Sequence, residues 1–399
     1  MDLTTLLANA VGRGASDVHL KVGQPPLIRF DGELEPLAAL PPLDAAQLEE
    51  ILQEVGAAVP ERLAAFEQTG ELDTAFKRAN LPRFRVNAFR QRGEISLAFR
   101  VIPSEIPSFE ELGLPAGVRR LASEHRGLIL VTGATGSGKT TTLAAMLDHI
   151  NRTRRQHIVT VEDPIEILHA DHGCIVNQRE IGIDTVSFEQ ALRRVLRQDP
   201  DVILIGELRD TESAHTALQA AESGHLVFST LHTIDAAETL GRMIEFFPAA
   251  KQPQIRSILA GTLRGVISQR LLPRTTNGRT PAVEVMVTNA RIQDLIRENR
   301  PDEIGDAIAS GEYYEMQTFA ASLIDLVLRG EVEREVAAGA ATNKHDFLVA
   351  LEAAEKRQRF DSEQDEAPAS NGDARPHPPT LLGAGLRTVG MSNGLPEGA

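Results

Sequence analysis

The chain has 399 residues, and its 41 basic and 56 acidic side chains give a formal net charge of −15 at pH 7. This negative charge argues against broad binding to nucleic acid, and the lack of Trp with only two Tyr argues against a platform that stacks bases. The single cysteine, Cys174, excludes an internal disulfide and a four-cysteine zinc site. We therefore expect neither nucleic acid nor zinc as a partner.

Membrane insertion and secretion are also disfavoured. The sequence contains no run of 18 or more apolar residues, and no basic segment precedes its first apolar stretch. A lone cysteine suits a reducing compartment. We therefore expect a cytoplasmic protein without a membrane-spanning helix or a secretory signal.

Residues 1–103 show the patterns of a small α+β domain. An Asp-Gly pair after the segment 27–30 predicts a hairpin, because these residues supply the positive φ that a tight turn needs. The segments 83–89 and 95–103 predict a second pair of strands, and a helix is expected over about 44–66.

Strands and helices alternate after a proline-marked linker, 104–116. Short, continuously apolar strands separated by helices are typical of a parallel sheet covered on both faces, and we assign 117–358 to one α/β domain. Residues from about 281 to 358 look mainly helical, and the Pro- and Gly-rich tail, 359–399, is expected to be disordered. The predicted strands are 126–133, 157–163, 201–207 and 225–232.

The most specific motif is a glycine-rich loop between a predicted strand and a predicted helix. It matches the P-loop pattern GxxxxGK[ST] at every fixed position, and such loops hold phosphate oxygens on backbone N–H groups at a helix N-terminus. Lys139 is expected to reach the β- and γ-phosphates of ATP, and the Thr140 hydroxyl to hold Mg²⁺. The residues assigned to nucleotide binding here are Gly133, Ala134, Thr135, Gly136, Ser137, Gly138, Lys139, Thr140 and Thr141.

Two predicted parallel strands end in acidic residues, at the edge of the sheet where α/β proteins bind ligands. Glu162 and Asp163 follow one strand, and Glu207 follows another. One carboxylate could polarise the attacking water and another could organise Mg²⁺, and the residue pattern does not decide between them. Asp210, directly before a predicted helix, is expected to be its N-cap.

Two histidines and two arginines complete the candidate residues. His225 and His232 bracket one strand; His232 follows its carboxyl end, where it could sense the γ-phosphate or a neighbouring subunit, and a structural role is simpler for His225. Alternation along the strands turns Arg85 and Arg100 away from the core of the N-terminal region. They could bring positive charge to a phosphoryl group from another domain or subunit, or be solvated surface arginines.

Taken together, these motifs resemble those of the secretion ATPase superfamily, in particular its branch of type IV pilus retraction ATPases. The resemblance spans residues 1 to about 350 and includes VTVEDPIEILH, ALRRVLRQDPDVILIGELRD and GHLVFSTLHTIDAAETLGRMIEFFP, which are similar to the family's Asp box, Walker B region and His box. It implies an α/β protein with a PAS-like α+β N-terminal domain, followed by a RecA-like P-loop ATPase domain with a helical C-terminal part. The implied assembly is a homohexamer that hydrolyses ATP with Mg²⁺.

The same resemblance implies residue roles. Glu162 becomes the base that activates water, and Glu207 the Walker B carboxylate near Mg²⁺. The implied catalytic residues are Glu162, Glu207, Lys139 and His232. The residues implied to reach the nucleotide from elsewhere are His225 of the His box and, from the N-terminal domain, Arg85 and Arg100.

The implied function is a motor that powers pilus retraction and twitching motility from the inner face of the cytoplasmic membrane. An inner-membrane pilus platform protein and a paralogous ATPase are the implied partners. The alternatives are a pilus-assembly or type II secretion ATPase, a nucleic-acid motor, and an accessory ring subunit. The absence of a four-cysteine insertion argues against a pilus-assembly or type II secretion ATPase, and the acidic composition argues against a nucleic-acid motor. The intact Lys139, Glu162 and Glu207 argue against an accessory subunit.

The sequence departs from the retraction branch at two elements, and the second of them is linked to retraction rather than to hydrolysis. The family's GMQT segment begins here with Glu315, and its AIRNLIRE element is altered at Gln293 and Asp294. These changes bear on the direction of force and leave the hydrolysis motifs untouched.

Overall fold

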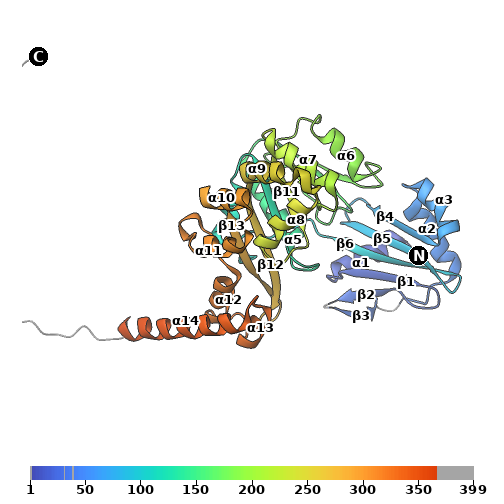
Figure 1. Cartoon of the computed structure of the whole chain (residues 1–399). Helices are drawn as coiled ribbons and strands as arrows, with labels where there is room; N and C mark the ends of the chain where they lie inside the picture. The colour runs from blue at the N-terminus through green and yellow to red at the C-terminus, as the bar shows by residue number, and fades with distance from the viewer. Residues whose placement is uncertain (1, 31, 38–39, 366–399) are drawn as a thin grey trace, which may run out of the picture. The chain divides into compact units, whose positions relative to one another are not determined.

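The computed structural model describes residues 2–30, 32–37 and 40–365, without the side chains of 360–365, and within them it forms two β-sheets (Figure 1). The first sheet has six strands in the order β3-β2-β1-β6-β5-β4, and every neighbouring pair is antiparallel. Its strands are β1 (Asp17–Lys21), β2 (Leu27–Phe30), β3 (Glu33–Pro36), β4 (Glu71–Phe76), β5 (Arg83–Gln91) and β6 (Glu94–Ile102).

The predicted hairpins and helix of this region are found with one change. β2 pairs with β3 and β5 with β6, as predicted, although Asp31 of the first turn lies outside the described residues. The single helix expected over 44–66 is wrong, because Pro60 begins a second helix and cannot continue the first. The helices here are α1 (Leu3–Gly12), α2 (Ala45–Gly56) and α3 (Pro60–Thr69), and they share one apolar core with the sheet.

The second sheet has seven strands in the order β13-β12-β7-β11-β10-β8-β9. All four predicted parallel strands are confirmed as β7, β8, β10 and β11, and all residues of β7 and β11 are buried. Its strands are β7 (Gly127–Thr132), β8 (His157–Glu162), β9 (Ile175–Glu180), β10 (Val202–Ile205), β11 (Leu226–Leu231), β12 (Leu263–Pro273) and β13 (Arg279–Val287).

Three strands of this sheet were not predicted. β9 is a polar edge strand, so it lacks the apolar run that identifies a buried strand. β12 runs parallel to β7 and antiparallel to β13, which makes the sheet mixed. The expectation of mainly helical structure from 281 is therefore wrong for 281–287, where β13 is buried between β12 and the C-terminal helices.

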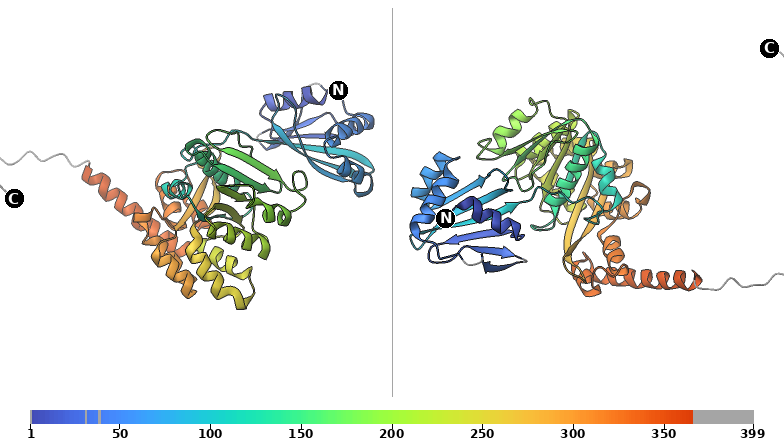
Figure 2. Two further views of the ribbon diagram at one scale, coloured as in Figure 1. Left: turned by 90° about the horizontal axis from the view of Figure 1, so that it is seen from above. Right: turned by 180° about the vertical axis from the view of Figure 1, so that it is seen from behind.

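Helices lie against both faces of the seven-stranded sheet, as complete burial of its central strands requires (Figure 2). α5 packs on β7 next to α4, while α7 packs on β7 and β11 next to α9. The helices between β6 and β12 are α4 (Ala116–Ala122), α5 (Lys139–Thr153), α6 (Phe188–Val195), α7 (Thr211–Glu222), α8 (Ala236–Glu245) and α9 (Gln252–Thr262).

The region after β13 is helical, as predicted. Part of it forms a separate apolar cluster that includes Phe319, Leu323, Phe347 and Leu351. None of the helices within the described residues is long and apolar enough to cross a membrane. The first residues of the predicted disordered tail, 359–365, belong to a helix, and 366–399 lie outside the described residues. The helices are α10 (Ala290–Glu298), α11 (Ile304–Ala309), α12 (Phe319–Leu328), α13 (Arg334–Ala340) and α14 (Lys344–Asp365).

Glu284, on β13, is a buried carboxylate that joins two helix N-termini to the sheet. It accepts the N–H of Ala236 (2.9 Å) at the start of α8 and the backbone N–H of Phe319 at the start of α12. Burial raises the pKa of Glu284 to about 7; the Asp235 carboxylate adds to this rise, and the N–H donors and the Arg270 guanidinium oppose it. The residue therefore titrates close to neutral pH.

A Glu284→Gln variant is expected to be less sensitive to pH than the wild type. The folded-state pKa lies above the ordinary value of 4.5, so the folded chain holds this proton more tightly than the unfolded chain. That contribution to stability is fully present below about pH 4.5 and is lost as pH rises through about 7, a loss of about 3 kcal/mol. Urea unfolding at about pH 5 and about pH 7.5 measures most of this loss, which glutamine abolishes.

Glu298→Gln, on the exposed end of α10, is the matched control because it removes a carboxylate without changing a buried group. The control should follow the wild-type pH dependence. If wild type and Glu284→Gln lose the same free energy of unfolding between the two pH values, Glu284 does not carry a buried proton.

Candidate functional site

A glycine-rich loop connects the end of β7 to the start of α5. Its glycines are required by the backbone: φ is +139° at Gly133, +79° at Gly136 and +92° at Gly138. A Cβ on Gly133 would also collide with the carbonyl oxygen of Gln269 on β12. The loop ends at the N-terminus of the 15-residue helix α5. Backbone N–H groups and the helix dipole favour an anion there.

Lys139 bends back over this loop. Its Nζ donates hydrogen bonds to the carbonyl oxygens of Gly133 (2.6 Å) and Ala134 (3.0 Å). The side chain is half-buried, and this burial lowers the pKa of Lys139, which the carboxylate of Glu166 partly opposes. The ammonium group is thus held at the mouth of the loop, where it could transfer its hydrogen bonds to a phosphate.

The loop forms one wall of a cavity of about 570 Å³. Most of the residues assigned to the nucleotide line it, although they come from four different strand ends. The predicted site residues around it are Thr135, Gly136, Ser137, Gly138, Lys139, Thr140, Thr141, Glu162, Glu207 and His232. The structure therefore brings together the P-loop, both acidic strand ends and one histidine.

Glu162 is the last residue of β8, and only 8% of it is exposed. Its Oε1 accepts hydrogen bonds from Thr160 Oγ1 (2.6 Å) and from Gln178 Nε2 (3.1 Å). Burial raises the pKa of Glu162, and these two donors oppose the rise. A desolvated carboxylate of this kind is a stronger base than an exposed one, as activation of water requires.

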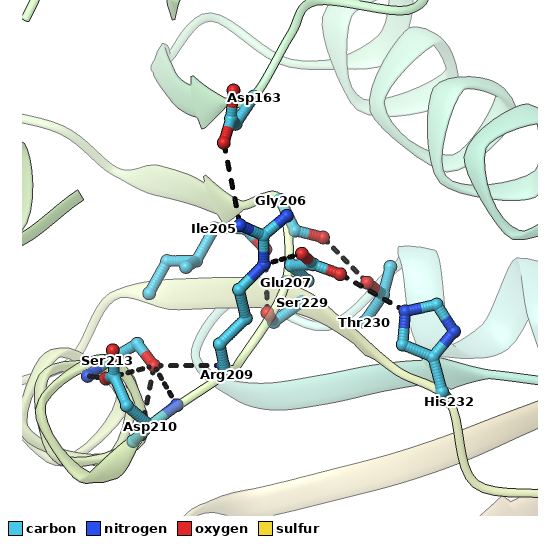
Figure 3. A network of polar contacts seen from close by, with 10 residues as sticks. All are labelled: Asp163, Ile205, Gly206, Glu207, Arg209, Asp210, Ser213, Ser229, Thr230 and His232. Atoms are coloured by element: carbon cyan, nitrogen blue, oxygen red, sulfur yellow. Dashed lines mark hydrogen bonds and ion pairs between the residues drawn. The ribbon is translucent and has the colours of Figure 1, made fainter. Parts of the chain in front are cut away.

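Glu207 lies between two nitrogen donors, Arg209 and His232 (Figure 3). One oxygen pairs with Nε of Arg209, and the other lies 3.2 Å from Nε2 of His232. Burial lowers the pKa of His232, and the charges of Lys139 and Arg209 lower it further. A lowered pKa favours the neutral ring, and a ring with its proton on Nε2 can donate it to the Glu207 carboxylate.

Arg209 belongs to this site and was missed in the sequence analysis. Its guanidinium bridges Glu207 and Asp163, with Nη1 3.6 Å from Asp163 Oδ2, and it also lines the cavity (Figure 3). The sequence signal for a role of Arg209 in the site is its position two residues after Glu207. The start of helix α7 at Thr211 explains a polar segment there equally well, so this signal is weak. The arginine thus connects the acidic ends of β8 and β10.

The backbone that carries Glu207 and Arg209 is held at both ends. Ser229 Oγ donates to the Ile205 carbonyl (2.6 Å), and Thr230 Oγ1 donates to that of Gly206 (2.7 Å). The prediction that Asp210 is an N-cap is confirmed, because its side chain accepts the N–H of Ser213 at the start of α7. Figure 3 shows these bonds framing the loop after β10.

Besides Gly133 and Ala134 of the loop, three predicted nucleotide residues do not line the cavity. His225 precedes β11, at the opposite end of that strand from His232, and its Nδ1 lies 3.0 Å from the Ala220 carbonyl oxygen. The parity prediction for the two arginines agrees with the structure: Arg85 and Arg100 face each other on β5 and β6, away from buried neighbours. Arg100 donates to Asp17 (2.8 Å). None of these three residues lines the P-loop cavity, so their contact with nucleotide stays a prediction.

The residues present fit a magnesium ion that arrives with a phosphate. Thr140 and Glu207 line the same cavity and offer a hydroxyl and a carboxylate, the hard oxygen ligands that Mg²⁺ prefers. Mg²⁺ usually takes one or two protein ligands and completes its shell with phosphate oxygens and water. Within residues 2–365 as described, no cluster of three or more His, Cys, Asp or Glu could hold a metal.

Residues 1–338 match the model of the type II/IV secretion system protein family. The chain belongs to this family. It is 45% identical, over 347 residues, to the type IV pilus retractation ATPase PilT of Pseudomonas aeruginosa. That match covers 87% of this chain and 100% of the relative. The chain is 38% identical over 352 residues to the type IV pilus ATPase PilU of the same organism, covering 88% and 91%.

A solved structure gives the same assignment. The crystal structure of the pilus retraction motor PilT with bound ADP superposes with a TM-score of 0.80 at 43% sequence identity. The match covers 87% of this chain and 98% of that one. The α/β fold, with one antiparallel and one mainly parallel sheet, is therefore that of this family of ATPases.

Proposed function

We propose that this chain is an ATP-hydrolysing motor subunit that powers type IV pilus retraction. This proposal rests on a P-loop cavity that is also lined by Glu162 and Glu207, in a chain that is 45% identical to a retraction ATPase over that relative's whole length. The loop glycines, the helix N-terminus and the lysine supply a phosphate site. The two carboxylates supply a base and a metal ligand.

The chain's own residues would bind the nucleotide before any chemistry occurs. The N–H groups of the loop bind the phosphates, and Lys139 exchanges its two loop carbonyls for phosphate oxygens. Thr140 and Glu207 would hold Mg²⁺, which when bound offsets the negative charge that develops on the phosphates. His232 keeps Glu207 oriented through its Nε2 proton.

Glu162 would act as the base in hydrolysis. It accepts a proton from the water whose oxygen forms a bond to the γ-phosphorus, while the bond between that phosphorus and the bridging oxygen breaks and ADP leaves. Burial makes the Glu162 carboxylate a better proton acceptor than an exposed glutamate. Lys139 stabilises the charge on the transferred group.

The rest of the mechanism depends on an assembly. We place the chain in a homohexamer, with a PAS-like domain at 1–103, a linker at 104–116 and a RecA-like ATPase domain at 117–358. Arg85, Arg100 and His225 would then meet nucleotide only when domains or subunits come together, which agrees with their absence from the lining of the cavity in one chain. Nucleotide would favour the closed arrangement, and phosphate release the open one.

The cellular setting follows from the same proposal. The ring would work at the inner face of the cytoplasmic membrane, against an inner-membrane pilus platform protein. A paralogous ring is a second proposed partner, supported by the similarity to PilU. Closure around the ring would displace the platform protein and withdraw pilin subunits.

An accessory ring subunit is a second candidate, because the C-terminal elements of the family are altered in this chain, one of them at Glu315. The structure shows how the fold tolerates this change: Glu315 takes a φ of +59°, a conformation natural for glycine, and Gln317 still pairs with Val285 on β13. An accessory subunit would show little ATP hydrolysis when purified alone. A primary motor would show full turnover without other components.

The function is tested by deleting the gene and counting pili. The expected phenotype is excess surface pili with lost twitching, restored by the wild-type gene and not by one carrying Lys139→Ala. Loss of pili would instead indicate an assembly ATPase. Unchanged pili and twitching would contradict the proposal.

A further inference from the structure

Gln178 is a partly buried amide beside Glu162 that the sequence motifs did not single out. It lies on the edge strand β9, where its backbone is in register with Thr160 of β8. Its Nε2 donates to Glu162 Oε1 (3.1 Å) and to the Ile167 carbonyl oxygen (2.9 Å), and its Oε1 accepts the N–H of His169 (2.8 Å). Both ends of the amide are therefore occupied.

These bonds allow only one orientation of the Gln178 amide. A carboxylate and a carbonyl oxygen only accept hydrogen bonds, so Nε2 must face Glu162 and Ile167. The backbone N–H of His169 only donates, so Oε1 must face it. Glutamine at this position consequently presents a donor, and never an acceptor, to the carboxylate.

Glu162 needs such donors because it is buried. Water cannot solvate its negative charge, and the Glu166 carboxylate in the following loop disfavours that charge further. Thr160 and Gln178 are the two side chains that donate to it. Other charged or titratable groups around the cavity are Lys139 of α5, Asp163 and His169 of the loop after β8, Glu207 and Arg209 after β10, His232 after β11, and Arg279 of β13.

We propose that Gln178 is a positioning residue that keeps Glu162 ionised and aimed into the cavity, an inference that rests on the proposed role of Glu162 in ATP hydrolysis. Because β9 pairs with β8 along its length, the strand pairing sets the distance between amide and carboxylate. The amide is anchored at two further points, so it holds the carboxylate in one rotamer. Gln178 itself touches neither water nor nucleotide in this scheme.

The test compares the pH dependence of ATP turnover in Gln178→Leu, Asn177→Leu and the wild type. Leucine is similar in size to glutamine and donates no hydrogen bond. Loss of the donor should shift the acid limb of the kcat–pH profile to higher pH by about one unit, which lowers kcat about tenfold at a pH on that limb. The KM for ATP should stay within about twofold of the wild-type value. Asn177 is the matched control, because it lies on the opposite face of β9 and contacts His157. Its acid limb should not move.

Thr160→Val removes the other donor with little change in volume and should shift the limb in the same direction, even if Gln178→Leu folds poorly. A limb that stays in place in both variants, or a kcat lowered equally at every pH, would overturn the inference. That result differs from failure of the proposed function, in which the wild type itself binds or hydrolyses no ATP.

Discussion

A Glu162→Gln variant is expected to hydrolyse ATP at least about 100-fold more slowly than the wild type while binding ATP with nearly unchanged affinity. Glutamine keeps the size of the side chain but cannot accept a proton from water. Thr160 can still donate to the amide oxygen, so the local structure should persist. Single-turnover hydrolysis and calorimetric titration with ATP and Mg²⁺ separate the chemical step from binding.

The matched control is Glu222→Gln, an exposed glutamate at the end of α7 that lies outside the cavity. Its turnover should equal that of the wild type. Hydrolysis by Glu162→Gln at more than about one tenth of the wild-type rate would remove Glu162 from the role of base. Glu207 would then be the first alternative, because both of its carboxylate oxygens face nitrogen donors in the cavity.

Replacing Lys139 with alanine is expected to weaken ATP binding by at least about 100-fold. The Nζ atom makes two hydrogen bonds to loop carbonyls in this structure, and a phosphate would take over both as stronger, charge-assisted bonds. Two such bonds at roughly 1.5 kcal/mol each give about 3 kcal/mol, or about a hundredfold in dissociation constant. Calorimetry with ATP and Mg²⁺ measures the loss directly.

Lys251→Ala is the control, since Lys251 is exposed and lies outside the cavity. It should bind ATP as the wild type does. Binding to Lys139→Ala within about threefold of the wild type would mean that the loop amides hold the phosphates without the lysine, and the site would have to be reassigned.

How far the sequence predicts this molecule depends on whether a feature is local. The P-loop was predicted from eight consecutive residues, because the glycine conformations, the strand and the helix start are all set within the same short segment. The four buried parallel strands were predicted for a similar reason: strands covered on both faces are apolar along their whole length. Strand β9 was missed because an edge strand has no such pattern.

The predicted site shows the same division. That Glu162, Glu207 and His232 share an edge of the sheet followed from their places at strand ends. That Arg209 bridges Glu207 to Asp163 depends on β10 lying beside β8, which no local pattern specifies. His225 was expected at the nucleotide from the resemblance, and the fold places it at the other end of β11.

The sequence by itself therefore determined the phosphate loop, the four buried parallel strands and the identity of the acidic residues at their ends. Only the tertiary structure decided which side chains hold those acids, such as Gln178 on Glu162 and His232 on Glu207. The physical reason is that backbone conformation responds to neighbours along the chain, whereas the hydrogen bonds of a buried carboxylate depend on strand order and register.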